Sequence, residues 1–232
     1  MAEFVLAGRR VVVTGASRGL GYAIARRLSE EGARVAACAR SAEGLAALSE
    51  ACGGIDTAAF DLRDTDALRA FLREVGPVDA LVNNAGVGWY KPLVETTPEE
   101  LDATLDVNLR ALMHACHAVL PSMLERSGGY IVNIASDLAR RPLAQMAAYV
   151  AAKHGVLGFG ASLLREVKDH GVRVTTILPG IVDTYFGGGQ PGRDVAGALR
   201  PEAVADAVLH VLTLPDEVVV DELTLHPLGQ AF

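Results

Sequence analysis

The amino-acid sequence predicts an α/β fold in which helices cover a parallel sheet. Short runs rich in β-branched residues alternate with longer amphipathic stretches along most of the 232 residues. Such alternation is typical of repeated strand–helix units, in which each helix returns the chain to the same edge of the sheet. The sequence also contains no linker or low-complexity tract. We therefore expect a single domain over residues 1–232.

Seven short apolar runs have the length and composition of buried strands, and six longer stretches between them have the pattern of helices. The expected strands cover residues 10–14 (RVVVT), 34–39 (RVAACA), 55–60 (IDTAAF), 78–83 (VDALVN), 130–135 (YIVNIA), 172–178 (VRVTTIL) and 217–225 (EVVVDELTL). The expected helices cover residues 19–32, 42–52, 65–75, 98–126, 147–169 and 201–212.

Start and stop signals support several of these helices. Asp64 and Thr97 can accept hydrogen bonds from free amides at a helix start, and Pro201 fits a first helical turn. Glycine, which ends many helices, stands at the expected stops, at Gly32, Gly128 and Gly171.

Charge and composition exclude some partners. The net charge is −7 and no cluster of Lys and Arg is present, which argues against nucleic-acid binding. No basic leader precedes a long apolar core, and no apolar stretch reaches the length of a membrane span. We therefore expect a cytoplasmic protein with no membrane partner.

The cysteines and histidines do not form a metal-binding or disulfide pattern. Cys38, Cys52 and Cys116 are scattered without CxxC spacing, which favours reduced, buried thiols. His114 and His117 can share a helix face, but no further ligand follows at a known spacing. We expect no metal site.

A glycine-rich turn follows the first expected strand in VVVTGASRGLG. Gly15, Gly19 and Gly21 allow the backbone to turn sharply and to approach a phosphate closely. The helix that begins here offers unpaired N–H groups and the positive end of its dipole to an anion. A tight turn without a ligand is the alternative interpretation.

Two further motifs lie where ligands bind in open α/β sheets. LVNNAG, residues 81–86, ends the fourth strand near the expected reversal of strand order, where an Asn-rich turn is the simpler alternative. In YVAAK, Tyr149 and Lys153 are four residues apart, so their side chains share a helix face. Such a pair also occurs by chance on many helices.

Together TGASRGLG, NNAG, NIAS, YVAAK and PGIVDT resemble the short-chain dehydrogenase/reductase family over essentially the whole chain. The resemblance implies a single Rossmann-type, doubly wound domain with a seven-stranded parallel sheet. It also implies a nicotinamide cofactor and a homotetramer or homodimer.

The same resemblance implies a catalytic tetrad of Asn108, Ser136, Tyr149 and Lys153. Ser136 would orient a carbonyl, Tyr149 would act as general acid/base, and Asn108 would act through an ordered water. Hydride transfer to a carbonyl builds negative charge on oxygen, so hydroxyl donors fit this chemistry. We expect the ammonium of Lys153 to lower the pKa of Tyr149, because a nearby cation favours the phenolate.

The resemblance also implies the cofactor contacts. In the family Lys153 binds the ribose, Asp61 meets the adenine, the loop at Pro179 meets the carboxamide, and Thr184 meets the pyrophosphate or the carboxamide. The complete expected set is Gly15, Ser17, Arg18, Gly19, Leu20, Gly21, Arg40, Asp61, Leu62, Asn84, Ala85, Gly86, Tyr149, Lys153, Pro179, Gly180, Ile181 and Thr184.

The residues after the second strand predict NADP(H) rather than NAD(H). A carboxylate at the end of this strand binds the ribose hydroxyls of NAD and repels a 2′-phosphate. Here Ala39 stands in its place, followed by Arg40, and Arg18 lies in the glycine turn. Two guanidiniums can bind a phosphate through charge-assisted hydrogen bonds, although each arginine alone can also be a solvated surface charge.

We therefore expect an NADP(H)-dependent oxidoreductase that interconverts a carbonyl and a secondary alcohol. A cofactor-sensing regulatory protein on the same fold is the alternative, but such a protein does not need the complete tetrad. A Gly-rich segment, about residues 184–200, is expected to be a substrate lid. The substrate stays open among a 3-oxoacyl thioester, a β-hydroxy acid and other carbonyl compounds. The expected mouth contains Trp89, Tyr90, Leu138, Arg140, Arg141, Leu143, Met146 and Tyr185.

The C-terminal tail lacks the glycine-rich end that many family members have after the last strand. The chain instead reads DEVVVDELTLHPLGQAF. This difference leaves open what the tail contacts.

Overall fold

The computed structural model describes residues 5–192 and 197–230, and in them seven strands form one sheet in which every pairing is parallel. The spatial order is β3-β2-β1-β4-β5-β6-β7. The strands are β1 (Arg10–Thr14), β2 (Arg34–Ala39), β3 (Asp56–Ala59), β4 (Ala80–Asn83), β5 (Gly129–Ile134), β6 (Val172–Pro179) and β7 (Glu222–Leu225).

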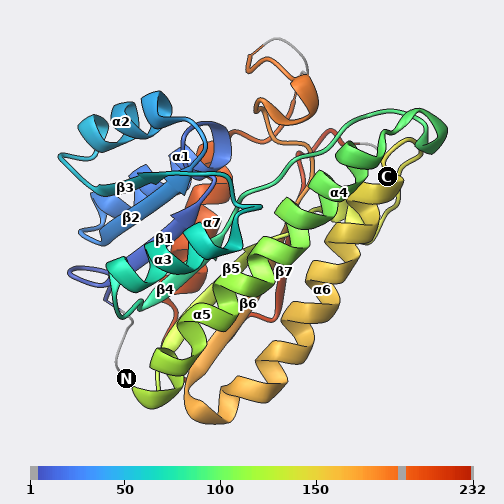
Figure 1. The fold of residues 1–232 in the computed structure, drawn as a ribbon. Coiled ribbons are helices and arrows are strands. Elements are labelled where there is room, and N and C mark those ends of the chain that lie inside the picture. The colour runs from blue at the N-terminus through green and yellow to red at the C-terminus, as the bar shows by residue number, and fades with distance from the viewer. Residues whose placement is uncertain (1–4, 193–196, 231–232) are drawn as a thin grey trace.

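Helices cover both faces of this sheet, as Figure 1 shows. One face carries α1 (Gly19–Glu30), α2 (Ala42–Ala51) and α7 (Pro201–Thr213). The other carries α3 (Thr65–Val75), α4 (Pro98–Leu105), α5 (Ala111–Glu125) and α6 (Ala147–Val167). The prediction of a doubly wound Rossmann-type sheet is confirmed. Because strand order reverses between β1 and β4, a crevice for ligands is expected at the carboxyl ends of these strands.

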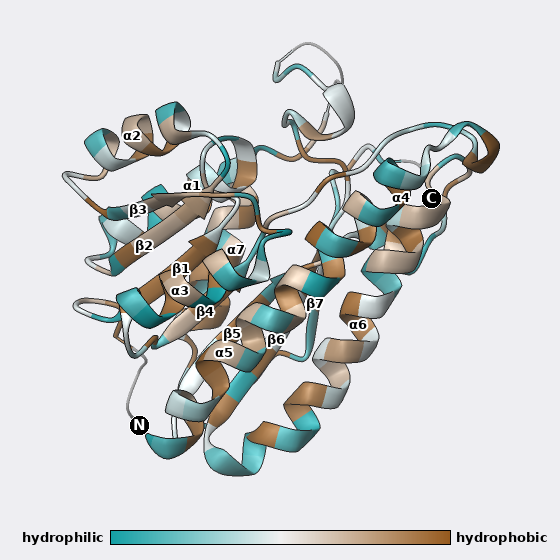
Figure 2. Cartoon of the chain, viewed as in Figure 1, coloured by the Kyte–Doolittle hydropathy of each residue, from teal (hydrophilic) through white to brown (hydrophobic). Residues whose placement is uncertain are grey.

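The five inner strands, from β2 to β6 in the sheet, are buried on both faces, which explains their nearly continuous apolar sequences. Val11, Val12 and Val13 of β1 are fully buried, and alternate residues contribute to the two separate cores. Figure 2 shows the central strands in shades of brown and the polar residues mainly toward the outside of the helices.

Local capping chemistry sets several helix boundaries as predicted. The Asp64 carboxylate accepts hydrogen bonds from the amides of Asp66 and Ala67 at the start of α3. Thr97 and Glu100 form a reciprocal capping box at the start of α4. Pro201 occupies the first turn of α7.

The predicted stops are confirmed at two glycines, and the third is modified. Gly32 (φ +81°) follows α1 and Gly171 (φ +72°) follows α6, both in a backbone conformation that side chains disfavour. After α5, however, Ser127 is the left-handed residue (φ 51°), and Gly128 follows it.

Two predicted elements are wrong in part. The helix expected over 98–126 contains a π-helical turn at Asp106–Arg110, designated η2, between α4 and α5. The strand expected over 217–225 begins only at Glu222. Here the guanidinium of Arg173 donates hydrogen bonds to the carbonyls of Leu214 (3.0 Å) and Pro215 (3.1 Å), and these contacts hold the preceding residues in a turn.

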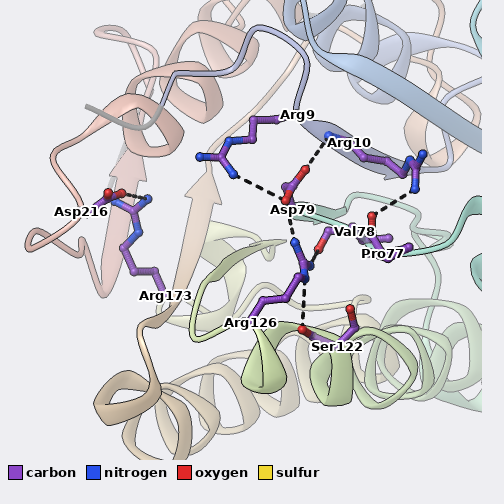
Figure 3. A network of polar contacts seen from close by, with 9 residues as sticks. All are labelled: Arg9, Arg10, Pro77, Val78, Asp79, Ser122, Arg126, Arg173 and Asp216. Atoms are coloured by element: carbon purple, nitrogen blue, oxygen red, sulfur yellow. Dashed lines mark hydrogen bonds and ion pairs between the residues drawn. The ribbon is translucent and has the colours of Figure 1, made fainter. Parts of the chain in front are cut away.

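The amino end of the sheet is closed by arginines around Asp79 (Figure 3). The Asp79 carboxylate accepts hydrogen bonds from the backbone N–H of Arg10 (2.8 Å) and from the side chain of Arg126 (2.8 Å), and Arg9 lies 3.7 Å away. These contacts join β1, the chain before β4 and the end of α5. The site described next lies at the opposite end of the strands.

Candidate active site

The turn after β1 forms a close-packed cradle for a phosphate. Gly15 has φ +69°, and a Cβ atom there would lie 2.7 Å from the Cα of Ala85. A Cβ atom on Gly21 would overlap the carbonyl oxygen of Gly15. Both positions therefore require glycine for close backbone approach, as the phosphate-binding interpretation predicts.

The helix after this turn begins in a form suited to an anion. Arg18 precedes α1 in an extended conformation and, in the described chain, its side chain makes no capping hydrogen bond. The first-turn amides of α1 thus remain available to a ligand, and the positive end of the helix dipole faces the same place.

The NNAG motif joins β4 to the glycine turn. Asn84 Nδ2 donates a hydrogen bond to the carbonyl oxygen of Thr14 (2.9 Å). Thr14 Oγ1 accepts hydrogen bonds from the amides of Asn84 (3.1 Å) and Ala85 (3.2 Å). The asparagine is therefore a structural bridge that fixes the crevice between β1 and β4.

Three of the predicted catalytic side chains meet between the end of β5 and the start of α6. Ser136 follows β5, and its hydroxyl is near enough to the phenol of Tyr149 to act on the pKa of that phenol. Lys153 Nζ donates to the carbonyl oxygen of Ile134 (2.8 Å) and lies 5.6 Å from the centre of the Tyr149 ring. All three side chains are buried.

The π-helical turn η2 brings the fourth residue to the same place. Asn108 Nδ2 donates to the carbonyls of Val87 (2.7 Å) and Thr104 (2.8 Å). Its Oδ1 is buried and has no hydrogen-bond partner among the described residues. A Cβ atom on Gly86 would lie 2.9 Å from this Oδ1 and 3.8 Å from Lys153 Nζ, so Gly86 leaves space beside both. An orphaned buried acceptor fits a bound water or ligand group.

Burial dominates the electrostatics of this site. It raises the pKa of Tyr149 well above its usual range, although the Ser136 side chain acts in the opposite direction. Burial also lowers the pKa of Lys153 to about 8. Our expectation of a lowered tyrosine pKa is wrong for this structure, because desolvation of the phenolate outweighs the favourable influences.

The residues expected to select NADP(H) have different neighbours. Ala39 is buried at the end of β2 and Arg40 is exposed. The guanidinium of Arg18 lies over the ring of Tyr185, 5.0 Å from its centre. Asp61 pairs with Arg63 (2.7 Å), which lowers the pKa of Asp61. Arg40 is one of the cations that lower the pKa of Asp61.

The remaining expected cofactor residues lie along the same edge. Leu62 is buried in one of the two cores, and Leu20 is partly buried against the other. The methyl-bearing end of Thr184 lies beside Gly19, since a Cβ atom there would be 3.5 Å from Thr184 Cβ. Ser17 packs its backbone against Gly44 at the start of α2. Pro179 ends β6, and Gly180 and Ile181 follow it.

The sequence interpretation missed Phe186, which covers the site. Its ring centre lies 4.9 Å from that of Tyr149, and its edge packs against Gly88. Phe186 belongs to the segment expected to be a lid, of which residues 193–196 lie outside the described residues. An aromatic residue shortly after PGIVDT was the available signal.

One arginine of the expected mouth is held in an ion pair. Arg140 binds both carboxylate oxygens of Glu222 at 2.7 Å, which links the chain after β5 to β7. Trp89, Tyr90, Leu143 and Tyr185 are exposed, whereas Met146 is buried. The mouth is therefore more apolar than its arginines suggest.

Two features are absent from residues 5–192 and 197–230. No group of three or more His, Cys, Asp or Glu side chains there is arranged to hold a metal ion. No helix in these ranges is long and apolar enough to span a membrane.

Comparisons with known proteins agree with this geometry. The family model for short chain dehydrogenase matches residues 9–190. D-erythrulose reductase from Gallus gallus is 38% identical over 181 residues, which cover 78% of this chain and 74% of that protein.

Two solved structures with related sequences have the same fold. The alcohol dehydrogenase from the archaeon Thermococcus sibiricus, complexed with 5-hydroxy-NADP, has a TM-score of 0.89 and 34% identity, covering 96% of this chain and 98% of that one. A closed form of serine dehydrogenase complexed with NADP+ has a TM-score of 0.90 and 34% identity, covering 96% of each chain. The chain therefore belongs to the short-chain dehydrogenase/reductase family of oxidoreductases.

Proposed function

We propose that this protein is an NADP(H)-dependent oxidoreductase that interconverts a carbonyl compound and a secondary alcohol, with Tyr149 as general acid/base. The observation that carries the proposal is the buried cluster of Ser136, Tyr149 and Lys153 beside the orphaned Oδ1 of Asn108. A protein that only binds a cofactor does not need this cluster.

The cofactor would lie across the crevice described above. The amides at the start of α1 and the glycine turn would hold its phosphates, and Arg40 with Arg18 would bind the 2′-phosphate. Two structural neighbours carry NADP+ or an NADP derivative, which supports this choice. When bound, the reduced nicotinamide supplies the hydride.

The side chains of the chain supply the proton and the stabilisation of charge. Ser136 and Tyr149 donate hydrogen bonds to the carbonyl oxygen as negative charge develops on it. Tyr149 then transfers its proton to this oxygen. The raised pKa of Tyr149 keeps the phenol protonated at neutral pH, which is the form that carbonyl reduction requires.

Lys153 and Asn108 support that transfer. The ammonium of Lys153 stabilises the phenolate left after proton transfer, since opposite charges attract strongly in a buried site. Asn108 Oδ1 can accept a hydrogen bond from a water beside Lys153, because Gly86 leaves space there. Such a water would help to return a proton to the site.

The surroundings support a carbonyl substrate with an apolar portion. Phe186 and the exposed rings of Trp89 and Tyr90 border the site. We further propose that the protein is cytoplasmic and forms a homodimer or homotetramer.

Turnover tests this function directly. Reduced cofactor consumption is measured with a panel of ketones, hydroxyketones, aldehydes and 3-oxoacyl thioesters. Tyr149→Phe is expected to lower kcat by at least ~100-fold while NADPH still binds, because the phenol supplies the proton. Tyr130→Phe removes another buried phenol, which is bonded to Thr175 (2.8 Å) away from the site, and should retain turnover. Near-normal turnover of Tyr149→Phe would exclude the proposed acid.

A further inference from the structure

The C-terminal segment Leu225–Gln230 folds back onto the catalytic end of the sheet. The carbonyl oxygen of Leu225 accepts a hydrogen bond from the amide of Gly180 (2.7 Å). A turn follows, in which the amide of Gln230 donates to the carbonyl oxygen of Pro227 (3.0 Å). The segment therefore lies directly beside the loop after β6.

Gln230 joins two parts of the active site through its carboxamide. Its Nε2 donates a hydrogen bond to Asp137 Oδ2 (2.6 Å), and its Oε1 accepts one from the amide of Ile181 (3.1 Å). A Cβ atom on Gly180 would overlap Gln230 Oε1, so the glycine gives this side chain its place. Both polar ends of the carboxamide are thus used, and both partners lie near the expected nicotinamide position.

Asp137 places a negative charge next to the catalytic serine. Its side chain is only 7% exposed, and a buried carboxylate requires compensating donors. Ser136 Oγ lies 3.4 Å from its Oδ1, while Gln230 Nε2 and His226 Nε2 (3.3 Å) approach its Oδ2. Two of these three groups belong to the C-terminal segment, which therefore holds the carboxylate in place.

We propose that Gln230 is a positioning residue of the active site, acting through Asp137 on the hydroxyl of Ser136 and through the Ile181 amide on the loop after β6. Neither Asp137 nor Gln230 needs to touch the substrate for this role. The inference rests on the proposed function, because Ser136 is taken to orient the carbonyl.

The charge of Asp137 gives the arrangement a chemical consequence. After burial, which is the main influence, Asp137 is one of the groups that raise the pKa of Tyr149. A carboxylate held near the phenol disfavours the phenolate and keeps the acid form ready for carbonyl reduction.

A polarity swap tests the contact without changing its shape. Gln230→Glu sets two carboxylates against each other and is expected to lower kcat ~10-fold or more. Adding Asp137→Asn restores a donor and an acceptor in this contact, because the amide introduced at position 137 can donate to the carboxylate introduced at position 230. The double variant should therefore recover most of the lost kcat. Leu228→Ala alters a fully exposed side chain of the same segment and should leave kcat unchanged. Equal kcat values for Gln230→Glu and Leu228→Ala would overturn the inference.

A second background separates positioning from general structural damage. If Gln230 acts through Ser136, then Gln230→Glu should lower kcat by less than ~2-fold in a Ser136→Ala protein, because the serine hydroxyl that it positions is already absent. A structural role would instead lower activity equally in both backgrounds, which would refute the proposal.

Hydrogen exchange keeps the inference separate from the proposed function. Failure of the unmodified protein to consume NADPH with the whole panel would contradict the function alone. Even then, exchange of the Ile181 amide should be faster in Gln230→Glu than in the unmodified protein. It should be slow again in the double variant that combines Gln230→Glu with Asp137→Asn. Unchanged exchange would show that Gln230 does not hold this loop.

Discussion

At the scale of single residues, burial shifts the pKa values of two buried ionisable groups of α6 in opposite directions. The phenol of Tyr149 becomes a weaker acid, while the ammonium of Lys153 loses its proton more readily, with a pKa of about 8. Both shifts favour the uncharged forms, as expected when water is removed from a site. Loss of water from the site therefore shifts the pKa values of both groups before any ligand is bound.

This shift predicts the pH dependence of carbonyl reduction. The ammonium form of Lys153 predominates below about pH 8 and is lost above it. The kcat/KM for NADPH, which reports the free enzyme, should therefore be level below this pH and fall above it. Tyr149 does not produce this limb, because its raised pKa keeps it protonated. Lys153→Arg should remove the fall, since arginine stays charged. If kcat/KM for NADPH still fell at high pH in that variant, another group would be responsible for the fall.

Cofactor preference is also decided by single residues. Ala39 ends β2, where an acid would favour NAD(H), and Arg40 follows it. The double replacement Ala39→Asp with Arg40→Ala should shift the ratio of kcat/KM values toward NADH by ~10-fold or more. Arg34→Ala, at the other end of β2, should leave the ratio unchanged. A higher kcat/KM with NADH than with NADPH in the unmodified protein would refute the NADP(H) assignment.

At the scale of elements, local chemistry explains what the sequence predicted well. Capping by Asp64 and Thr97 depends on neighbours within a few residues, so these boundaries can be read from the chain. The short β7 depends instead on Arg173, more than 40 residues before the carbonyls that it binds. The π-helical turn at Asn108 has no local signature either. Contacts distant in sequence thus account for the short strand.

The segment after β6 supports a prediction about substrate affinity. Phe186 packs on Tyr149 and Tyr185 lies under Arg18, so adjacent side chains face different parts of the site. Phe186→Ala should raise KM for apolar ketones by ~10-fold through lost burial, with a smaller effect on KM for NADPH. Tyr185→Ala should show the reverse. These KM values are measured by varying the ketone and NADPH in turn. If each variant changed both KM values equally, Phe186 and Tyr185 would not serve different parts of the site.

At the scale of the whole molecule, motif order predicted the site better than any single motif did. The four tetrad positions come from three separate places in the chain, η2, the end of β5 and α6, and the parallel sheet brings them together at one edge. Gln230 and Phe186 were missed because their roles depend on how the C-terminal segment and the segment after β6 fold back over that edge. Neither path is encoded in a local pattern.

The outer surface of α4 and α5 predicts assembly. Leu101, Leu105 and Met113 expose 36%, 39% and 43% of their surface, and α6 presents the open Gly158 beside these helices. Figure 2 shows brown, apolar segments along these helices. Apolar and small residues in excess of one buried face favour contact between copies of the chain. We expect sedimentation at micromolar concentration to give a homodimer or homotetramer.

Charge on that surface should separate the copies. Leu105→Glu combined with Met113→Glu would bury carboxylates in the contact, and the resulting desolvation cost should yield a monomer. Val94→Glu adds a charge at a 92% exposed side chain outside these helices and should leave the assembly intact. Both variants should keep the circular dichroism spectrum of the unmodified protein, so that a change in mass reports assembly rather than unfolding. A monomeric unmodified protein would exclude the proposed contact. A double variant that still sediments as an oligomer would place the contact on another surface.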